Sequence, residues 1–269
     1  MTIKTPHSTQ HGFSLIELAV VIAVVALLIG GIVIGASLIR SGEIRSVMTD
    51  NERYVTAIRA FETKYQHLPG DLDTATSYWG DNATLCSDAA ITDGAPGTCN
   101  GNANGDYDQA ATNGGTGELF QSWNQLALAG LIQGSFSGAA GSGGRRECLV
   151  TSKNCPVSKL RDGMWTTYTT NFFAGDSAAY AIHYGNFLQF GREQTANPPF
   201  TPVLTPSEAY TIDAKIDDGR PALGRVIARF WNGTCAAADD GTNAFNDYAA
   251  SYRVSDTALR CALYFTQQF

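Results

Sequence analysis

The feature that most limits how this chain can fold is an uncharged stretch of 22 residues, Leu18 to Ile39, near its N-terminus. At about 1.5 Å per residue, a helix of this length crosses a hydrocarbon core roughly 30 Å thick. The stretch is too long for the apolar region of a secretory signal, no small-residue cleavage site follows it, and no polar face divides it. Since the residues after Arg40 are polar and rich in glycine, the sequence predicts one membrane segment followed by one ectodomain.

The overall composition is that of a chain with an ordinary folded core. The chain has 269 residues, of which 44% are hydrophobic, enough for one large domain or two small ones. The chain has a net charge of -7 and a pI near 5.0, so the soluble part has no overall excess of basic residues. A local strip of basic residues would be compatible with the same net charge. The charge therefore argues against nucleic acid or anionic lipid as the main partner of the ectodomain.

Six cysteines all lie beyond the membrane segment, and none forms a CxxC pair typical of redox or zinc sites. An even number in this position predicts disulfides formed in an oxidising compartment. Six cysteines allow about 15 pairings. Proximity along the chain favours three short loops, closed by Cys86 with Cys99, Cys148 with Cys155, and Cys235 with Cys261.

The N-terminal residues carry the most specific motif. Residues 11–18 read His-Gly-Phe-Ser-Leu-Ile-Glu-Leu and follow a polar leader with one lysine, Lys4, and no acid. This pattern resembles the processing motif of the type IV pilin and type II secretion pseudopilin superfamily, in which Gly12, Phe13 and Glu17 occupy the defining places. The resemblance implies that a prepilin peptidase cuts after Gly12 and that the new N-terminus on Phe13 is methylated. The chain would then be a substrate of these activities, and cleavage would remove Lys4 while keeping the apolar segment.

Glu17 places a carboxylate in an apolar helix, which costs about 2.5–3.5 kcal/mol near the bilayer centre and less near its edge. In the family its partner is the N-terminal amine of a neighbouring subunit, which is largely cationic at neutral pH because the pKa of such an amine is about 8. The plainer alternative is that Glu17 lies in the interface and reaches the headgroups. The resemblance also implies three partners: prepilin peptidase, other pilin or pseudopilin subunits, and an inner-membrane assembly platform.

An apolar stripe at spacings of three and four extends the helix beyond the membrane segment. Its residues are Ile44, Val47, Met48, Val55, Ile58, Phe61 and Tyr65. We therefore expect one helix from about Phe13 to Tyr65, ended by the turn at Pro69-Gly70. The predicted divisions of the chain are a leader at 1–12, a transmembrane or filament-core helix at 13–39, its amphipathic continuation at 40–68, and a head domain at 69–269.

The resemblance extends to residues 61–80, FETKYQHLPGDLDTATSYWG, which are similar to a segment common in pseudopilin-like proteins. The family fold is of the α+β class, a long N-terminal helix packed on the antiparallel sheet of a head that disulfides would staple here. The local patterns supply the parts for it. They predict a helix at 118–128, strands between 164 and 190 joined by a turn at Gly185-Asn186, a helix that starts with a capping box at Thr205 to Glu208 and runs to Ile216, and strands at 225–231 and 259–266.

Residues 81–117 read as a long loop, within which alternate polar residues imitate an oxygen-ligand calcium loop. The candidate ligands are Asn102, Asn104, Asp106 and Asp108, with Gly105 at the bend. Ala111 stands where an EF-hand has its bidentate glutamate. A plain turn of Asn and Gly residues explains the same pattern, so calcium is the one cofactor that the sequence leaves open.

The sequence does not predict an enzyme, because it contains no GxSxG, HExxH, Walker or GxGxxG motif. A signal-anchored envelope enzyme is the remote alternative, since a triad is spatial rather than sequential. The favoured function is a subunit of the type II secretion pseudopilus; the alternative is a minor subunit of a type IV pilus, acting in adhesion or DNA uptake. A head as large as 69–269 favours a minor subunit in either case. The expected location is the inner membrane, with a single span and a periplasmic head, and later a filament or the cell surface.

Overall fold

The computed structural model describes residues 14–82, 97–107, 117–141, 147–171, 173, 176, 178–195, 197–229, 234–237 and 246–269. Two compact units are distinguished within the chain, Met1–Gly42 and Glu43–Phe269. We name them the N-terminal unit and the head unit. Helix α1, Leu15–Tyr65, contributes its first part to the N-terminal unit and its last part to the head unit.

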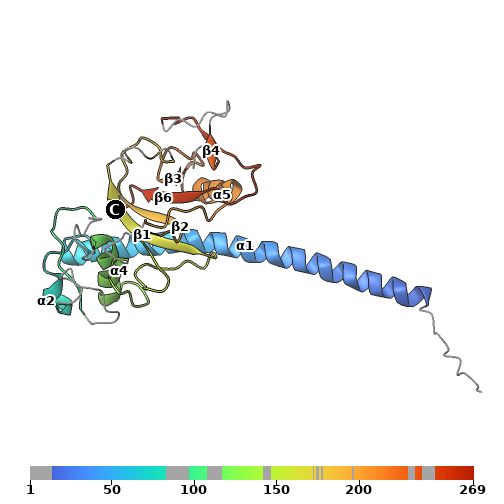
Figure 1. Ribbon diagram of the computed structural model, residues 1–269, viewed down its shortest axis with the longest axis horizontal. Helices are drawn as coiled ribbons and strands as arrows, with labels where there is room; N and C mark the ends of the chain where they lie inside the picture. Colours follow the sequence, from blue (N-terminus) through green and yellow to red (C-terminus); the bar gives the residue numbers. More distant parts are fainter. Residues whose placement is uncertain are drawn as a thin grey trace, which may run out of the picture. The chain divides into compact units, whose positions relative to one another are not determined.

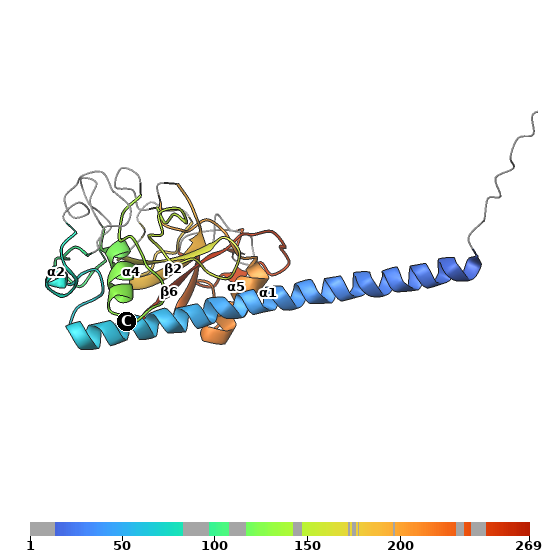
Figure 2. The same ribbon diagram turned by 90° about the horizontal axis from the view of Figure 1, so that it is seen from below.

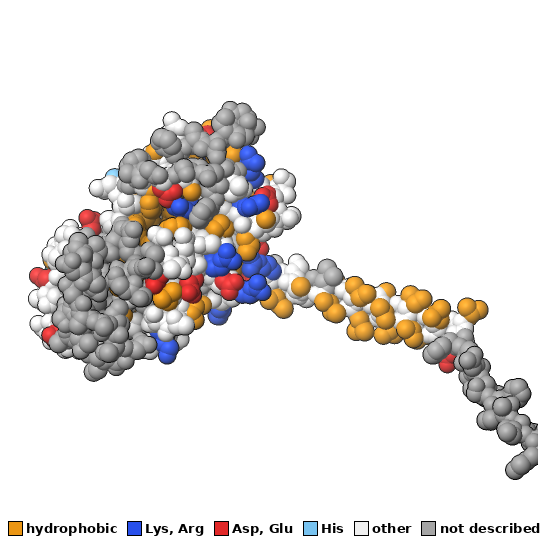
Figure 3. Space-filling view, in the orientation of Figure 1, with side chains coloured by type: hydrophobic (Ala, Val, Ile, Leu, Met, Phe, Trp, Pro, Cys, Tyr) orange, Lys and Arg blue, Asp and Glu red, His pale blue; other side chains and the backbone are white. Residues whose placement is uncertain are grey.

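In the N-terminal unit, α1 exposes large apolar side chains on every side of the helix. Leu27 is 77% exposed and Ile32 is 71% exposed, for example. Figure 3 shows hydrophobic side chains covering this part of α1 with little polar surface between them. By length and composition, α1 is the one helix among the described residues that is suited to cross a membrane. This surface is consistent with the predicted membrane anchor.

The head unit is built on a four-stranded sheet in which every neighbouring pair of strands is antiparallel (Figure 1). The strand order is β1-β2-β6-β3. The bounds are Gly163–Thr170 for β1, Gly185–Arg192 for β2, Ala262–Thr266 for β6 and Val226–Arg229 for β3. Two short strands, β4 (Ala236–Ala237) and β5 (Ser251–Tyr252), pair separately. The expected α+β class is confirmed.

One face of the sheet packs against residues 43–65 of α1, which run along it (Figure 2). Side chains alternate between the two faces of a strand, and Trp165 on β1 and Phe265 on β6 both point to this side. The ring of Tyr54 on α1 makes edge contacts with Trp165 at 5.7 Å and with Trp123 at 4.9 Å between centroids. Phe61 of α1 belongs to the same core and is fully buried. The predicted apolar stripe is therefore the part of α1 that packs into this core.

The opposite face of the sheet carries a second aromatic core. Tyr264 of β6 lies at its centre, with Phe187 of β2 at 5.3 Å and Tyr184 at 5.5 Å. Arg229 at the end of β3 donates to the hydroxyl of Tyr264 and forms a largely buried ion pair with Asp176. Both faces of the sheet are thus covered, as a sheet with apolar residues on each side requires.

The C-terminus of the chain is held against α1. Asn51 Nδ2 of α1 donates a hydrogen bond to Gln268 Oε1 at 3.0 Å, and Arg59 Nε donates to the backbone carbonyl of Gln268 at 2.8 Å. The ring of Phe269 meets Tyr107 edge-on at 6.2 Å. The last residues therefore fasten the sheet to the helix rather than forming a free tail.

Helix α4, Glu118–Leu128, has the predicted bounds but buries more polar side chains than its apolar spacing suggested. Gln125 accepts a hydrogen bond from the backbone N–H of Gly70 at 2.6 Å. Gln121 donates to the carbonyl of Gly138 at 3.0 Å. These side-chain amides provide hydrogen-bond partners for loop backbone groups that are not paired with a neighbouring strand. The polar face of α4 therefore holds the loops around it in place.

Helix α5 (Pro206–Ile216) confirms the predicted capping box. Thr205 Oγ1 accepts from the backbone N–H of Glu208 at 3.3 Å, and Glu208 Oε2 accepts from the backbone N–H of Thr205 at 2.9 Å. Helix α1 ends at Tyr65 as expected, while the expected start at Phe13 lies outside the described residues. The short helix α2, Ala75–Trp79, was not predicted.

The predicted turn at Gly185-Asn186 is wrong. Both residues begin β2 and pair with Thr170 and Thr169 of β1. The connection between the two strands is the longer segment that precedes Gly185, and it supplies Tyr180 and Tyr184 to the second aromatic core. Burial of these rings outweighed the local preference of a Gly-Asn pair for a tight turn.

Candidate functional site: the first turn of α1

The candidate functional site is the start of α1, where the sequence motif meets the helix. Ser14 is the last residue before the helix, which begins at Leu15. Glu17 Oε2 accepts a hydrogen bond from the backbone N–H of Ser14 at 2.8 Å, and Ser14 Oγ accepts from the backbone N–H of Ile16 at 3.2 Å. Leu18 N–H donates to the Ser14 carbonyl at 3.2 Å. Ser14 and Glu17 thus form a reciprocal cap on the first turn.

Glu17 is the only acidic residue between Ser14 and Gly42. Its neighbours one turn along the helix surface, Val20 and Val21, are apolar and each 57% exposed. The carboxylate therefore projects from an otherwise hydrophobic rod, where its one described polar partner is the N–H of Ser14. Negative charge at this position also interacts favourably with the N-terminal end of the helix dipole.

The remaining residues of the predicted processing motif, Gly12 and Phe13, lie outside the described residues. Residues 7–36 match the family model of the prokaryotic N-terminal methylation motif. The chain carries the N-terminal hallmark of type IV pilins and pseudopilins. The resemblance drawn from Gly12, Phe13 and Glu17 is confirmed at this level. No curated protein and no solved structure matches the chain.

The match identifies a pilin-like N-terminus, and the fold of the rest of the chain is consistent with that of a structural subunit. The motif implies processing by prepilin peptidase and assembly with other pilin subunits. The long helix and the antiparallel sheet give the architecture that the resemblance implied. Together they suggest a structural subunit.

The candidate calcium loop is organised around Asp71, a residue that the sequence analysis did not single out. Asp71 is 1% exposed, and its carboxylate accepts from the backbone N–H groups of Asn104 at 3.0 Å and Gly105 at 2.8 Å. Asn102 Oδ1 also accepts from the N–H of Asn104 at 3.0 Å. Backbone donors that converge in this way form an anion-binding concavity, which here holds the protein's own carboxylate.

Of the other proposed ligands, Asn104 Oδ1 accepts from the N–H of Asp106 at 2.9 Å, so its side chain serves the loop backbone. Asp108 lies outside the described residues. Calcium binding at these residues stays a prediction.

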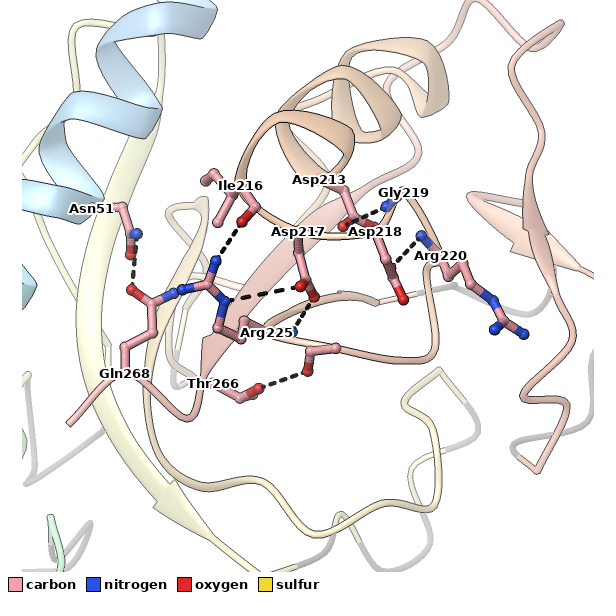
Figure 4. A network of polar contacts seen from close by, with 11 residues as sticks. Asn51, Asp213, Ile216, Asp217, Asp218, Gly219, Arg220, Arg225, Thr266 and Gln268 are labelled. Carbon is pink, nitrogen blue, oxygen red and sulfur yellow. Dashed lines mark hydrogen bonds and ion pairs between the residues drawn. The ribbon is translucent and has the colours of Figure 1, made fainter.

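A second acidic group was missed. Within the described residues, the carboxylates of Asp213, Asp217 and Asp218 form the one group of His, Cys, Asp or Glu close enough to share an ion, with oxygens within 4.8 Å. Three acids in six residues at the end of the helix were a visible signal for it. Figure 4 shows that the group already has protein partners: the side chain and backbone N–H of Arg225 bind Asp217, and the N–H of Arg220 binds Asp218.

Asp213 is the buried member of this group. Its carboxylate accepts from the hydroxyl of Tyr252 at 2.8 Å and from the N–H of Gly219 at 3.2 Å. Burial raises the pKa of Asp213 from 3.8 to about 7, against the lowering effect of these hydrogen bonds. The group works as a polar junction between α5, the loop that follows it and β5.

Two of the three disulfides suggested by proximity are present in the structure, Cys148–Cys155 and Cys235–Cys261. All four of these cysteines are buried. The pairing of Cys86 with Cys99 lies outside the described residues, because Cys86 does. The second bridge joins the residue before β6 to the residue before β4, which agrees with the predicted stapling of the C-terminal part of the sheet.

Proposed function

We propose that the chain is a minor pseudopilin of type II protein secretion, inserted in the inner membrane through α1 and assembled into an envelope filament after prepilin peptidase cuts between Gly12 and Phe13. The observation that supports this most directly is the methylation motif, which leads without interruption into one exposed apolar helix. The head would lie in the periplasm, where an oxidising environment suits the buried disulfides.

Glu17 would guide assembly. Before assembly its charge is held by a single backbone N–H of its own chain. The amine of Phe13 on a neighbouring subunit offers a full opposite charge, and such charge-assisted pairs are roughly twice as strong as neutral hydrogen bonds. The exposed apolar surface of α1 would pack against other subunits in the same step, so the carboxylate would fix the register of a contact that hydrophobic burial drives.

The size of the head supports a minor subunit. Glu43–Phe269 forms one compact unit that must be accommodated around closely spaced helices. A bulky head is easier to place at a few positions of a filament than at every repeat. The same argument applies to a minor subunit of a type IV pilus, so the assignment to secretion is tested separately from the assignment to a filament.

The first test is the intact mass and N-terminal sequence of the membrane-extracted protein, from cells with and without prepilin peptidase. We expect a chain beginning at methylated Phe13 only where the peptidase is present. A chain that keeps Met1 to Gly12 in both strains would refute the proposal and leave a signal-anchored envelope protein.

The second test separates assembly from processing. Glu17→Gln removes the charge and keeps the side-chain size, and we expect it to exclude the subunit from sheared filaments. Glu52→Gln, which removes an exposed acid from the head part of α1, is the matched control and should assemble normally. Deletion of the gene should reduce the proteins secreted into the medium; unchanged secretion with loss of surface pili would favour the pilus alternative.

A further inference from the structure

A cavity of about 330 Å³ lies at the end of the sheet where β1 begins and β2 ends. We propose that it binds a small zwitterion, in which a short carbon chain joins a phosphate or carboxylate to an ammonium group. This binding site is independent of the proposed function. Three segments of the head unit line the cavity: the loop closed by the Cys148–Cys155 disulfide, the chain that leads into β1, and the end of β2. The lining residues are Val150, Val157, Asp162, Met164, Arg192, Glu193, Gln194 and Thr195.

Backbone contacts hold these walls in place. The N–H of Trp165 donates to the carbonyl of Pro156 at 3.0 Å, which fixes the segment before β1 against that strand. The N–H of Arg192 donates to the carbonyl of Thr201 at 2.8 Å, and Thr201 Oγ1 donates to Gln194 Oε1 at 2.9 Å. The cavity is therefore formed without a ligand, as small-molecule sites usually are.

Arg192 and Glu193 bring opposite charges to the cavity. Because β2 ends at Arg192, strand alternation no longer separates the two side chains, and both line the same space. Among the described residues, neither side chain makes a hydrogen bond or an ion pair, with the other or with any third residue. The remaining charge, Asp162, already faces Arg161 at 3.6 Å between nitrogen and oxygen. One cation and one anion are thus left for a ligand.

The chemistry of these groups defines the ligand. The planar guanidinium of Arg192 matches a carboxylate or a phosphate with two parallel hydrogen bonds, and the carboxylate of Glu193 accepts from an ammonium. A ligand with a single charge would leave one of the two side chains unmatched. Val150 and Val157 are each more than half exposed, so they offer apolar contact to the carbon chain between the charges.

The size of the cavity limits the ligand further. Its volume lies near the lower end of the range of roughly 300–1,000 Å³ that is usual for small-molecule sites. It therefore suits a free amino acid or the phosphoethanolamine headgroup of a phospholipid, which share the required chemistry. A folded partner would need a larger surface.

The test is isothermal titration calorimetry of the full chain in a maltoside detergent, whose uncharged headgroup does not compete. The two probes are O-phosphoethanolamine, for the phospholipid headgroup, and L-leucine, for the free amino acid. We expect at least one of them to bind, and the tighter one identifies the source of the ligand. Inorganic phosphate and ethanolamine each carry one of the two charges, so both should bind at least about tenfold more weakly.

Substitutions assign the binding to the cavity. Arg192→Gln and Glu193→Gln should each weaken zwitterion binding at least about tenfold, because each removes a charged hydrogen-bond partner. Arg253→Gln and Glu52→Gln remove one exposed charge of each sign from residues that do not line the cavity, and should bind as the natural chain does. An unchanged urea midpoint, followed by the fluorescence of the buried Trp165, shows that each variant is folded.

Three results would overturn the proposal. The first is that neither zwitterion binds to the natural chain. The second is that binding is unchanged in folded Arg192→Gln and Glu193→Gln. The third is that inorganic phosphate or ethanolamine binds as tightly as the zwitterions, since the site would then recognise one charge only. None of these results bears on cleavage by prepilin peptidase, so the proposed function is tested separately.

Discussion

Replacing Asp213 with asparagine should remove a large pH dependence from the stability of the head. Asp213 is fully buried and its pKa rises to about 7, chiefly because burial disfavours the charged form. Asp217 and Asp218 stand beside it and oppose its ionisation further, while the cation of Arg225 is engaged by Asp217. Ionisation of Asp213 is therefore energetically unfavourable in the folded head.

The sign and size follow from linkage between protonation and folding. The pKa is higher in the folded chain than the ordinary 3.8, so the stabilisation is complete below pH 3.8 and is lost as the pH rises toward 7. One pH unit corresponds to 1.36 kcal/mol, which gives a total loss of roughly 4 kcal/mol. About 3 kcal/mol of this loss falls between pH 5 and pH 8.

The assay is urea unfolding of the detergent-solubilised chain with its disulfides intact, followed by the fluorescence of the buried Trp123 and Trp165. Between pH 5 and pH 8, the free energy of unfolding should fall in the natural chain and change much less in Asp213→Asn. Asp73→Asn alters an exposed acid of the head and should keep the natural slope. Equal slopes for the natural chain and Asp213→Asn would refute the reasoning.

Two further predictions concern packing and capping in the head. Phe61→Ala should lower the free energy of unfolding by about 3–5 kcal/mol, because the ring is fully buried in the core and packs against Trp79 of α2. The exposed Thr63→Ala should change it by less than about 1 kcal/mol. Urea titration measures both, and equal effects would contradict the packing described for Phe61. Thr205→Ala should lower the free energy of unfolding by about 1 kcal/mol, because α5 loses its cap, while Thr205→Ser should keep most of that stability. A urea midpoint that Thr205→Ala leaves unchanged would show that the cap contributes nothing to stability.

The sequence predicted the elements whose signals are local. The apolar run and the stripe from Ile44 to Tyr65 gave α1, and the capping box at Thr205 gave the start of α5, because both depend on residues a few positions apart. The N-terminal site could be found for the same reason, since its defining residues lie within a short motif.

What could not be predicted depends on partners distant in the chain. Asp71 binds N–H groups more than thirty positions away, and Gln125 binds Gly70 across 55 positions. Gly185 read as a turn because no local signal reveals that the segment before it covers a sheet face. The cap formed by Ser14 is local, by contrast, and the spacing of Ser14 and Glu17 would have been enough to propose it.

The position of β6 sets the order in which the head can be completed. This strand is the last of the chain, yet it lies between β2 and β3, and the residues after it fasten the sheet to α1. Until Ala262–Thr266 is in place, β2 and β3 have no common neighbour, and the edges that would face β6 stay unpaired. A chain that lacks β6 would therefore leave the sheet open at its centre, and unpaired strand edges of this kind are templates for pairing with other chains.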